Sequence, residues 1–368
     1  MSNNDLYCNR CKSQHHPVEC PSDNGEVILG IDPREEGYPR IGIGEKMKTK
    51  KAIITGLAGQ DGSYMAELLH GKGYEILGVV RNRNSKNLWR LNPLAEKDPC
   101  GFRIAVGDVT DPIFIRKIVS EFQPSEIYHF AAQSFVGRSW ESPLETMGVN
   151  LTGTMNVLEE ARRANYEIRV LQASSSEMFG VSKSPQNETT KFNPQSPYAV
   201  SKVAAHHMAV NYRESYGVWV ACSIAFNHES PRRGDSFVTK KIADAFKMAL
   251  NRPKLSHVHL KLGNLNSRRD WGYAPDYVEA MWRMLQGDKP VDYVIGTGVS
   301  RSVSDFIAEC RLVTGLDQKA VLVSQDETLK RPLDGFELRA DASLIEKELR
   351  WRPSTGFSEL VRKMIFDE

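Results

Sequence analysis

Short apolar runs alternate with longer amphipathic stretches along the middle of the chain. The runs cover residues 52–55, 75–80, 103–106, 126–131, 169–173 and 218–226, and continuous apolar runs of this length are typical of strands buried on both faces. Apolar residues at helical spacing fill the gaps, most clearly over 63–70, 112–122, 144–164 and 197–215. Repeated strand–helix units predict an α/β fold with a doubly wound parallel sheet and helices on both faces.

The pattern changes near residue 226. Polar loops rich in Arg and Asn follow, interrupted by an amphipathic stretch over 237–250. We therefore divide the chain into an N-terminal extension (1–48), a doubly wound domain (49–225) and a smaller C-terminal substrate-binding region (226–368). Some segments of the last region are expected to return to the doubly wound domain.

A glycine-rich turn follows the first strand. Gly56, Gly59 and Gly62 stand three residues apart, between the apolar run 52–55 and the helical pattern 63–70. Glycines let a backbone approach a pyrophosphate closely, and the helix N-terminus supplies N–H donors. This context predicts a Rossmann dinucleotide site, whereas a packing turn in another α/β fold is the alternative.

The ends of the next strands suggest which dinucleotide binds. Arg81 and Arg83 follow the second strand, where an NAD site usually has an acidic residue, so we predict that NADP binds with its 2′-phosphate on Arg81, with Arg83 as a second candidate. Asp108 follows the third strand and is expected near the adenine. Ala131 and Gln133 follow the fourth strand, at the edge that meets the cofactor. Each of these could instead be an ordinary loop residue.

A Tyr and a Lys four residues apart begin the stretch 197–215. Ser196 can cap this helix and Pro197 suits its first turn, so Tyr198 and Lys202 are expected on one helix face. A nearby ammonium would lower the pKa of the phenol and let Tyr198 exchange a proton with a substrate hydroxyl. An incidental pair on a surface helix is the alternative.

The fifth strand ends in the sequence Ser174-Ser175-Ser176-Glu177. Residues beyond the carboxyl end of such a strand face the ligand, where a Ser can hydrogen-bond a sugar hydroxyl. Tyr198 alone would suffice for hydride transfer, so the additional carboxyl of Glu177 points to a second proton transfer, as in elimination or epimerisation. Arg-containing loops at 227–233, 262–272 and 330–332 favour a second ligand that carries a diphosphate.

Composition and charge exclude several classes of function. The 368 residues are 40% hydrophobic and 26% charged with a formal net charge of +2, which gives no support for a nucleic-acid or membrane surface. No apolar run approaches the ~20 residues of a membrane span, and the first residues lack a signal-peptide pattern. The six Cys are not spaced as a disulfide framework, so we expect a cytoplasmic protein.

The N-terminal extension contains a candidate metal site. Cys8, Cys11, His16 and Cys20 could coordinate zinc tetrahedrally, but their spacing is one residue short of a zinc knuckle. A tail with reduced thiols is the alternative that this spacing favours.

From about residue 50 to its end, the chain resembles the extended short-chain dehydrogenase/reductase superfamily and, within it, the GDP-mannose 4,6-dehydratase family. The resemblance lies in residues 55–64, 172–177, 196–198, 227–234, 262–265 and 269–272. The stretches 227–234 and 262–272 are the most specific, and residues 1–48 have no counterpart. Ser176 precedes the acidic residue, where epimerases and dTDP-glucose dehydratases typically have Asp.

The resemblance implies an NADP-dependent dehydration of GDP-mannose to GDP-4-keto-6-deoxymannose, a step of GDP-fucose biosynthesis. It assigns Tyr198 to the proton of the carbon-4 hydroxyl, Glu177 to the carbon-5 proton and the carbon-6 leaving group, and Ser175 and Lys202 to supporting roles. It places further residues at the cofactor, namely Gln60, Asp61, His228 and Arg233. The residues implied at the nucleotide sugar are Asn227, Lys241, Arg269, Arg331 and Asp334.

Several alternatives stay open at this point. The substrate could be a related GDP-sugar such as GDP-manno-heptose, and the reaction could be that of a nucleotide-sugar epimerase. A reductase needs no carbon-5 base, so Glu177 argues against it. A zinc-bearing binding module without catalysis is a non-enzymatic alternative. Family members form homodimers or homotetramers, in which the loop after the second strand reaches a neighbour's cofactor, and we expect residues 81–85 to do likewise.

Overall fold

A computed structural model describes residues 6–8, 13–15, 49–98, 101–252, 257–329 and 336–367, of which the first two segments are described as backbone only. Those two segments, β1 (Leu6–Cys8) and β2 (Ser13–His15), form an antiparallel pair. No helix in the described part of the chain is long and apolar enough to cross a membrane.

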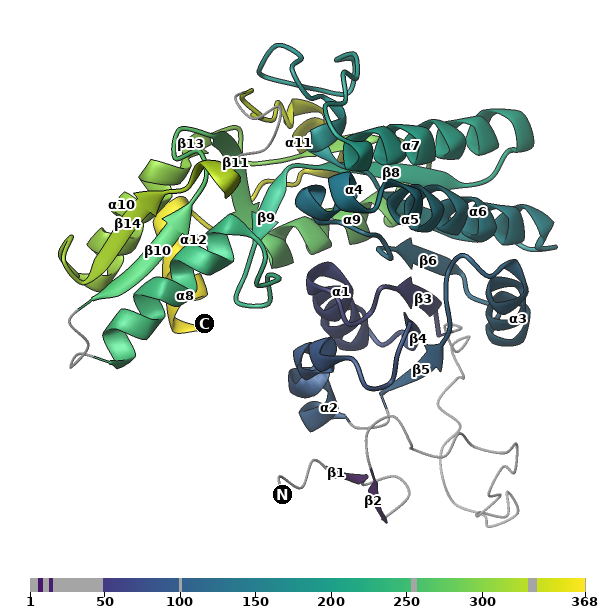
Figure 1. Ribbon diagram of the computed structural model, residues 1–368. Helices are drawn as coiled ribbons and strands as arrows, with labels where there is room; N and C mark the ends of the chain where they lie inside the picture. The colour runs from purple at the N-terminus through teal and green to yellow at the C-terminus, as the bar shows by residue number, and fades with distance from the viewer. Residues whose placement is uncertain are drawn as a thin grey trace.

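The central sheet of the described chain has seven strands in the order β12-β8-β7-β6-β3-β4-β5, and each neighbouring pair is parallel (Figure 1). The strands are β3 (Lys51–Thr55), β4 (Glu75–Val80), β5 (Phe102–Val106), β6 (Glu126–His129), β7 (Arg169–Ala173), β8 (Val220–Ala225) and β12 (Tyr293–Ile295). The sheet confirms the predicted doubly wound α/β class, and β12 is a segment of the C-terminal region that returns to it. Strand order reverses beside β3, where β4 lies on one side and β6 on the other.

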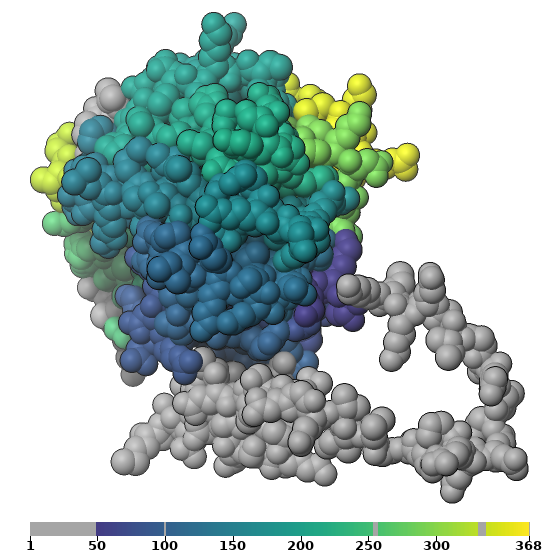
Figure 2. All heavy atoms as spheres, turned by 90° about the vertical axis from the view of Figure 1, so that its right-hand side faces the viewer, coloured from purple at the N-terminus to yellow at the C-terminus, as the bar shows by residue number. Residues whose placement is uncertain are grey.

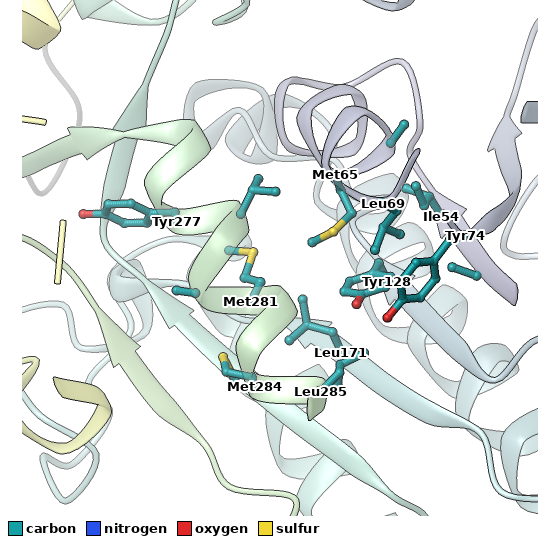
Figure 3. Packing of buried hydrophobic residues seen from close by; sticks show 14 of the residues in the cluster. Ile54, Met65, Leu69, Tyr74, Tyr128, Leu171, Tyr277, Met281, Met284 and Leu285 are labelled. Carbon is teal, nitrogen blue, oxygen red and sulfur yellow. The ribbon is translucent and has the colours of Figure 1, made fainter. Parts of the chain in front are cut away.

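Helices cover both faces of this sheet because each strand alternates its side chains between two apolar layers. On one face, α1 (Gln60–Gly71) packs against α9 (Ala274–Gln286). Figure 3 shows Met65 and Leu69 of α1 opposite Met281 of α9, with Tyr128 of β6 nearby. The helix α9 thus ties the C-terminal region to the sheet.

The other face is covered by α3 (Pro112–Phe122), α6 (Gly153–Arg163) and α7 (Pro197–Tyr216). Figure 2 looks onto the side of the molecule on which these helices lie. The predicted helix 144–164 is observed as α5 (Pro143–Met147), a π-helical turn over Gly148–Thr152, and α6. Short helices α2 (Asn92–Lys97), α4 (Val136–Glu141) and α11 (Ser343–Leu349) complete this part.

Short strands and three helices form the remaining part, at the left of Figure 1. One sheet contains β9 (Asn227–Glu229), β11 (Arg268–Tyr273) and β13 (Ser300–Ser302), and another pairs β10 (Val258–Leu262) with β14 (Val321–Gln325). The helices α8 (Val238–Asn251), α10 (Val303–Thr314) and α12 (Phe357–Phe366) bury a separate apolar core against these strands. Within the first of these sheets, β9 and β11 run parallel.

Candidate active site

The carboxyl ends of β3, β4, β6 and β7 face a cavity of about 820 Å³. The loops that follow these strands form one wall of the cavity, and residues of α8, β11 and the loop after β10 form the other. In open α/β sheets, ligands bind in this crevice, at the point where strand order reverses. The cavity therefore lies where the sequence placed the dinucleotide.

The glycine-rich turn between β3 and α1 is packed too closely for side chains. Gly56 has φ +72°, and a Cβ there would lie 2.9 Å from the backbone nitrogen of Ala131. A Cβ on Gly62 would lie 2.4 Å from the carbonyl oxygen of Gly56. Gly59 caps α1 without a side chain, and Gly56, Gly59 and Gly62 all line the cavity. A backbone cradle at a helix N-terminus fits a pyrophosphate.

Asp61 and His228 form an ion pair at the edge of this cradle. His228 Nε2 lies 3.0 Å from Asp61 Oδ1, and His228 Nδ1 lies 2.8 Å from the carbonyl oxygen of Phe226. Burial opposes the charged forms, but each partner stabilises the other, so the pKa of His228 is raised and that of Asp61 is lowered to about 2. The protonated imidazole can donate to both acceptors.

Gln60 lines the cavity, but its side chain is bound to protein groups. Its amide nitrogen donates to the carbonyl of His228 at 3.0 Å, and its amide oxygen accepts from the hydroxyl of Ser230 at 2.8 Å. The first residue of α1 thereby holds the loop after β9 in place.

The basic residues after β4 differ in exposure and in their position relative to the cavity. Arg81 is exposed and lines the cavity, whereas Arg83 is exposed outside its wall. Arg90, which the sequence analysis did not select, is buried in the wall and donates to the carbonyls of Arg232 at 2.8 Å and Ala58 at 3.0 Å. Arg90 thus joins the glycine-rich turn to the loop after β9.

Two predicted cofactor residues are not brought to the cavity. The carboxylate of Asp108 accepts from the N–H and hydroxyl of Thr110 in a local turn. The side chain of Gln133 is bound to Phe135 and Thr146, and its backbone pairs with Asn150 in the π-helical turn. Ala131 does line the cavity, as predicted.

Tyr198 and Lys202 both lie in the first turns of α7, which Ser196 caps by accepting from the N–H of Ala199. The Lys202 ammonium is 5.9 Å from the centre of the Tyr198 ring and donates to the carbonyl of Ala173 at 2.8 Å. Both side chains are buried and line the cavity, which makes an incidental surface pair the wrong interpretation.

The pKa of Tyr198 shifts in the direction opposite to the prediction. Burial raises it to about 12, against a hydrogen bond from Ser175 and the positive charge of Arg233, which lower it. Burial also lowers the pKa of Lys202 to about 8. In this structure desolvation of the phenolate therefore exceeds the effect of nearby cations on Tyr198.

Glu177 lies on a short 3-10 helix, Ser176–Met178, directly after β7. Its N–H donates to the Ser175 hydroxyl at 3.2 Å, and its negative charge acts on Tyr198 across the cavity. Glu177 Oε1 lies 3.5 Å from Arg269 Nε on β11. The acid, the phenol and Ser175 therefore converge on one space, the arrangement that two successive proton transfers require.

Of the other predicted substrate and cofactor residues, some line the cavity and others do not. Asn227, Arg233 and Arg269 line the cavity, and the Arg233 guanidinium packs 3.7 Å from the centre of the Phe237 ring. Lys241 is exposed on α8 and is not part of the cavity wall. Some predicted residues lie outside the described side chains, namely Arg331, Asp334, Cys8, Cys11, His16 and Cys20.

Comparison with known proteins agrees with this geometry. A family model described as GDP-mannose 4,6 dehydratase matches residues 53–364. The chain is 44% identical over 329 residues to GDP-mannose 4,6 dehydratase 1 of Arabidopsis thaliana, covering 87% of this chain and 90% of the relative. It is 42% identical to a GDP-mannose 4,6-dehydratase of Vibrio cholerae over 87% of this chain and 93% of that one.

The alignment with GDP-mannose 4,6 dehydratase of Homo sapiens, at 39% identity, covers 95% of this chain and 96% of the relative.

Solved structures with the same fold include enzymes that act on nucleotide sugars. UDP-glucose 4-epimerase of Thermus thermophilus in complex with NAD has a TM-score of 0.73 at 26% identity, covering 86% of this chain and 98% of that one. A dTDP-glucose 4,6-dehydratase of Streptomyces venezuelae with NAD and TYD bound has a TM-score of 0.74 at 25% identity, covering 86% and 96%. Both of these structures contain NAD.

Proposed function

The chain belongs to the GDP-mannose 4,6-dehydratase family, and from this premise we propose that it converts GDP-mannose into GDP-4-keto-6-deoxymannose with NADP as cofactor. The observation that carries the proposal is the convergence of Glu177, Ser175 and Tyr198 on the cavity beside the glycine-rich turn. A simple alcohol dehydrogenase would need the phenol but not the acid.

A nicotinamide dinucleotide fits the residues on the cofactor side. The backbone at Gly56, Gly59 and Gly62 would hold the pyrophosphate, and Lys202 the nicotinamide ribose. Arg81 supports NADP over NAD, because a basic residue after the second strand of the sheet accommodates a 2′-phosphate. When bound, the nicotinamide would supply in its oxidised form a hydride acceptor for carbon 4 and a positive charge that favours the phenolate of Tyr198, and in its reduced form a hydride donor for carbon 6.

Tyr198 accepts the proton of the carbon-4 hydroxyl while the carbon-4 hydride leaves, which gives a 4-keto sugar. The hydroxyl of Ser175, which is hydrogen-bonded to Tyr198, orients the reacting oxygen. The ketone acidifies the proton on carbon 5, which lies one bond away.

Glu177 removes the carbon-5 proton and donates a proton to the departing carbon-6 hydroxyl, so that water leaves and a carbon 5–carbon 6 double bond forms. Hydride addition at carbon 6, with transfer to carbon 5 of the proton that Tyr198 took from the carbon-4 hydroxyl, then gives the 6-deoxy sugar and restores Tyr198. The electrons taken from carbon 4 return to carbon 6, so the net change is the loss of one water molecule.

The substrate side supports a nucleoside diphosphate sugar. Asn227 and Arg269 provide an amide and a cation on the cavity wall. Charged fork-shaped donors of this type bind diphosphates well. These residues fit GDP-mannose and a related GDP-sugar such as GDP-manno-heptose equally well.

Assembly and compartment form a further part of the proposal. Exposed Trp140, Leu144 and Val200 lie on the neighbouring helices α4, α5 and α7, which supports a homodimer or homotetramer, as in the family. The buried free thiols of Cys222 and Cys310 support a cytoplasmic location. Zinc in the N-terminal extension stays a separate hypothesis, which elemental analysis of the purified protein would test.

Incubation with GDP-mannose, without added reductant, tests the proposal. We expect a 4-keto-6-deoxy product by mass spectrometry and NMR with no net consumption of NADPH. Parallel incubations with GDP-manno-heptose and with NAD in place of NADP measure the sugar and cofactor preferences. A product with altered stereochemistry but no loss of water would identify an epimerase instead.

A further inference from the structure

Arg269 was expected to hold a substrate diphosphate, yet in the structure its guanidinium faces the catalytic acid. Arg269 Nε lies 3.5 Å from Glu177 Oε1, and the two side chains are only 8% and 13% exposed. A carboxylate this deeply buried is costly without a partner, so the pairing has an energetic basis.

The guanidinium is held in place from its other side. Its Nη1 donates to the carbonyls of Arg268 at 2.9 Å and Phe336 at 3.1 Å, and its carbon lies 4.9 Å from the centre of the Phe336 ring. With Nη1 directed to these carbonyls, Nε lies on the side of the guanidinium that faces Glu177. Both Arg269 and Glu177 also line a second, very small cavity behind the main one, so the pair forms part of the wall between the two spaces.

The strand that carries Arg269 is fixed by a buried carboxylate. Asp270, the next residue of β11, accepts from the N–H groups of Thr297 at 2.9 Å, Gly298 at 2.8 Å and Ala340 at 3.1 Å. Asp270 has no exposed surface. The backbone at Arg269 is therefore anchored to two loops distant in sequence.

We infer that Arg269 is a positioning residue for Glu177: it holds the carboxylate aimed into the cavity for the elimination step. The inference rests on the proposed function, since Glu177 has a second proton to transfer only in a dehydratase or related reaction. It differs from a role in diphosphate binding because it assigns the effect of Arg269 to the step after oxidation at carbon 4.

The test is a single-turnover reaction of the variant Arg269→Gln with saturating GDP-mannose and NADP, followed by absorbance at 340 nm. We expect reduced cofactor to form at near the wild-type rate and then accumulate, because elimination slows tenfold or more. Arg269→Lys, which keeps the charge, should restore part of the elimination rate. Absence of accumulation overturns the inference, whether or not turnover falls.

Affinity for GDP, measured by calorimetry on the same variants, provides a readout apart from turnover. A change of less than threefold agrees with the positioning role. If the variant loses GDP affinity but turns over at the wild-type rate at saturating substrate, Arg269 serves diphosphate binding alone. That result overturns the inference.

Arg268→Gln is the matched control, because the neighbouring side chain is half exposed and pairs with Glu337 and Asp305 on the surface. It should follow the wild type at 340 nm. If the wild type itself forms no 4-keto-6-deoxy product, the proposed function has failed, and that result is separate from any outcome with Arg269.

Discussion

The two sides of the cavity are built by different means. The cofactor side is made of backbone: a glycine-rich turn and strand ends whose positions follow from a continuous, buried parallel sheet. The substrate side is made of side chains on short strands and loops, held by buried polar groups such as Asp270. Close packing therefore fixes the first side, while the second depends on individual hydrogen bonds and ion pairs.

The candidate reacting groups lie at the boundary between the cofactor side and the substrate side. Glu177, Ser175 and Tyr198 come from the sheet side, whereas Arg269 reaches Glu177 from the substrate side. We expect a change on the sheet side to affect every step that needs cofactor, and a change on the substrate side to affect substrate affinity and elimination.

The largest effect is expected from Glu177→Gln, which keeps the size of the side chain but removes the acid. Product formation should fall 10²–10⁴-fold, about the usual contribution of a general acid or base. Reduction of the cofactor by GDP-mannose should persist, since oxidation at carbon 4 uses Tyr198. Rapid mixing at 340 nm with product analysis checks both expectations, and full turnover by the variant would contradict the assigned role.

Gly62→Ala tests the backbone side. The new methyl would lie 2.4 Å from the carbonyl oxygen of Gly56, so the turn must move, at a cost of about 1–3 kcal/mol. NADP affinity, measured by fluorescence titration, should weaken tenfold or more. Gly71→Ala is the control, since nothing lies within 4 Å of its added Cβ, and equal losses in both variants would refute the packing argument.

Asp270→Asn tests the side that depends on hydrogen bonds. An amide in place of the carboxylate turns one acceptor into a donor that faces backbone N–H groups, which should cost about 1–3 kcal/mol of unfolding free energy. The KM for GDP-mannose should rise while NADP affinity stays unchanged. Exposed Asp288→Asn serves as the control in urea unfolding, and weaker NADP binding in Asp270→Asn would break the distinction between the two sides.

The pair Asp61–His228 predicts an acid-dependent contribution to stability. Because the pKa of Asp61 is about 2 in the folded protein and its ordinary value is 3.8, its contribution is complete above pH 4, as long as His228 keeps its proton, and is lost as pH falls toward 2. The unfolding free energies of the wild type and Asp61→Asn should converge by about 2 kcal/mol over that range. A difference independent of pH would show that the pair does not act in this way.

Lys241→Ala should have the smallest effect. The side chain is exposed on α8 and away from the cavity wall, so kcat/KM for GDP-mannose should change less than twofold. A larger loss, measured in initial-rate assays, would show that the substrate side extends beyond the observed wall.

Most of the doubly wound sheet could be predicted because its signals are local. The predicted strand 75–80 and helix 112–122 match β4 and α3 residue for residue, since apolar runs, Pro112 and the cap Asp111 all act within a few positions. Ser196 likewise caps α7 as expected. The strands of the substrate side are as short as three residues, and no periodic signal marks them.

Side-chain destinations were less predictable. Asp108 and Gln133 stand at strand ends that face the cofactor edge, yet local turns satisfy their polar groups. In the sequence Arg90 resembles any other basic loop residue. In the structure its guanidinium donates hydrogen bonds to carbonyls 32 and 142 positions away. The pattern of a segment contains no information about partners at such separations.

The sequence by itself determined the sheet and the glycine-rich turn and selected the candidate reacting groups, because periodicity, glycine geometry and proton chemistry are properties of neighbouring residues. Tertiary structure alone decided the pKa of Tyr198 and the partner of Glu177. Burial and ion pairing depend on which distant segments meet, and here β11 meets the end of β7 across the cavity.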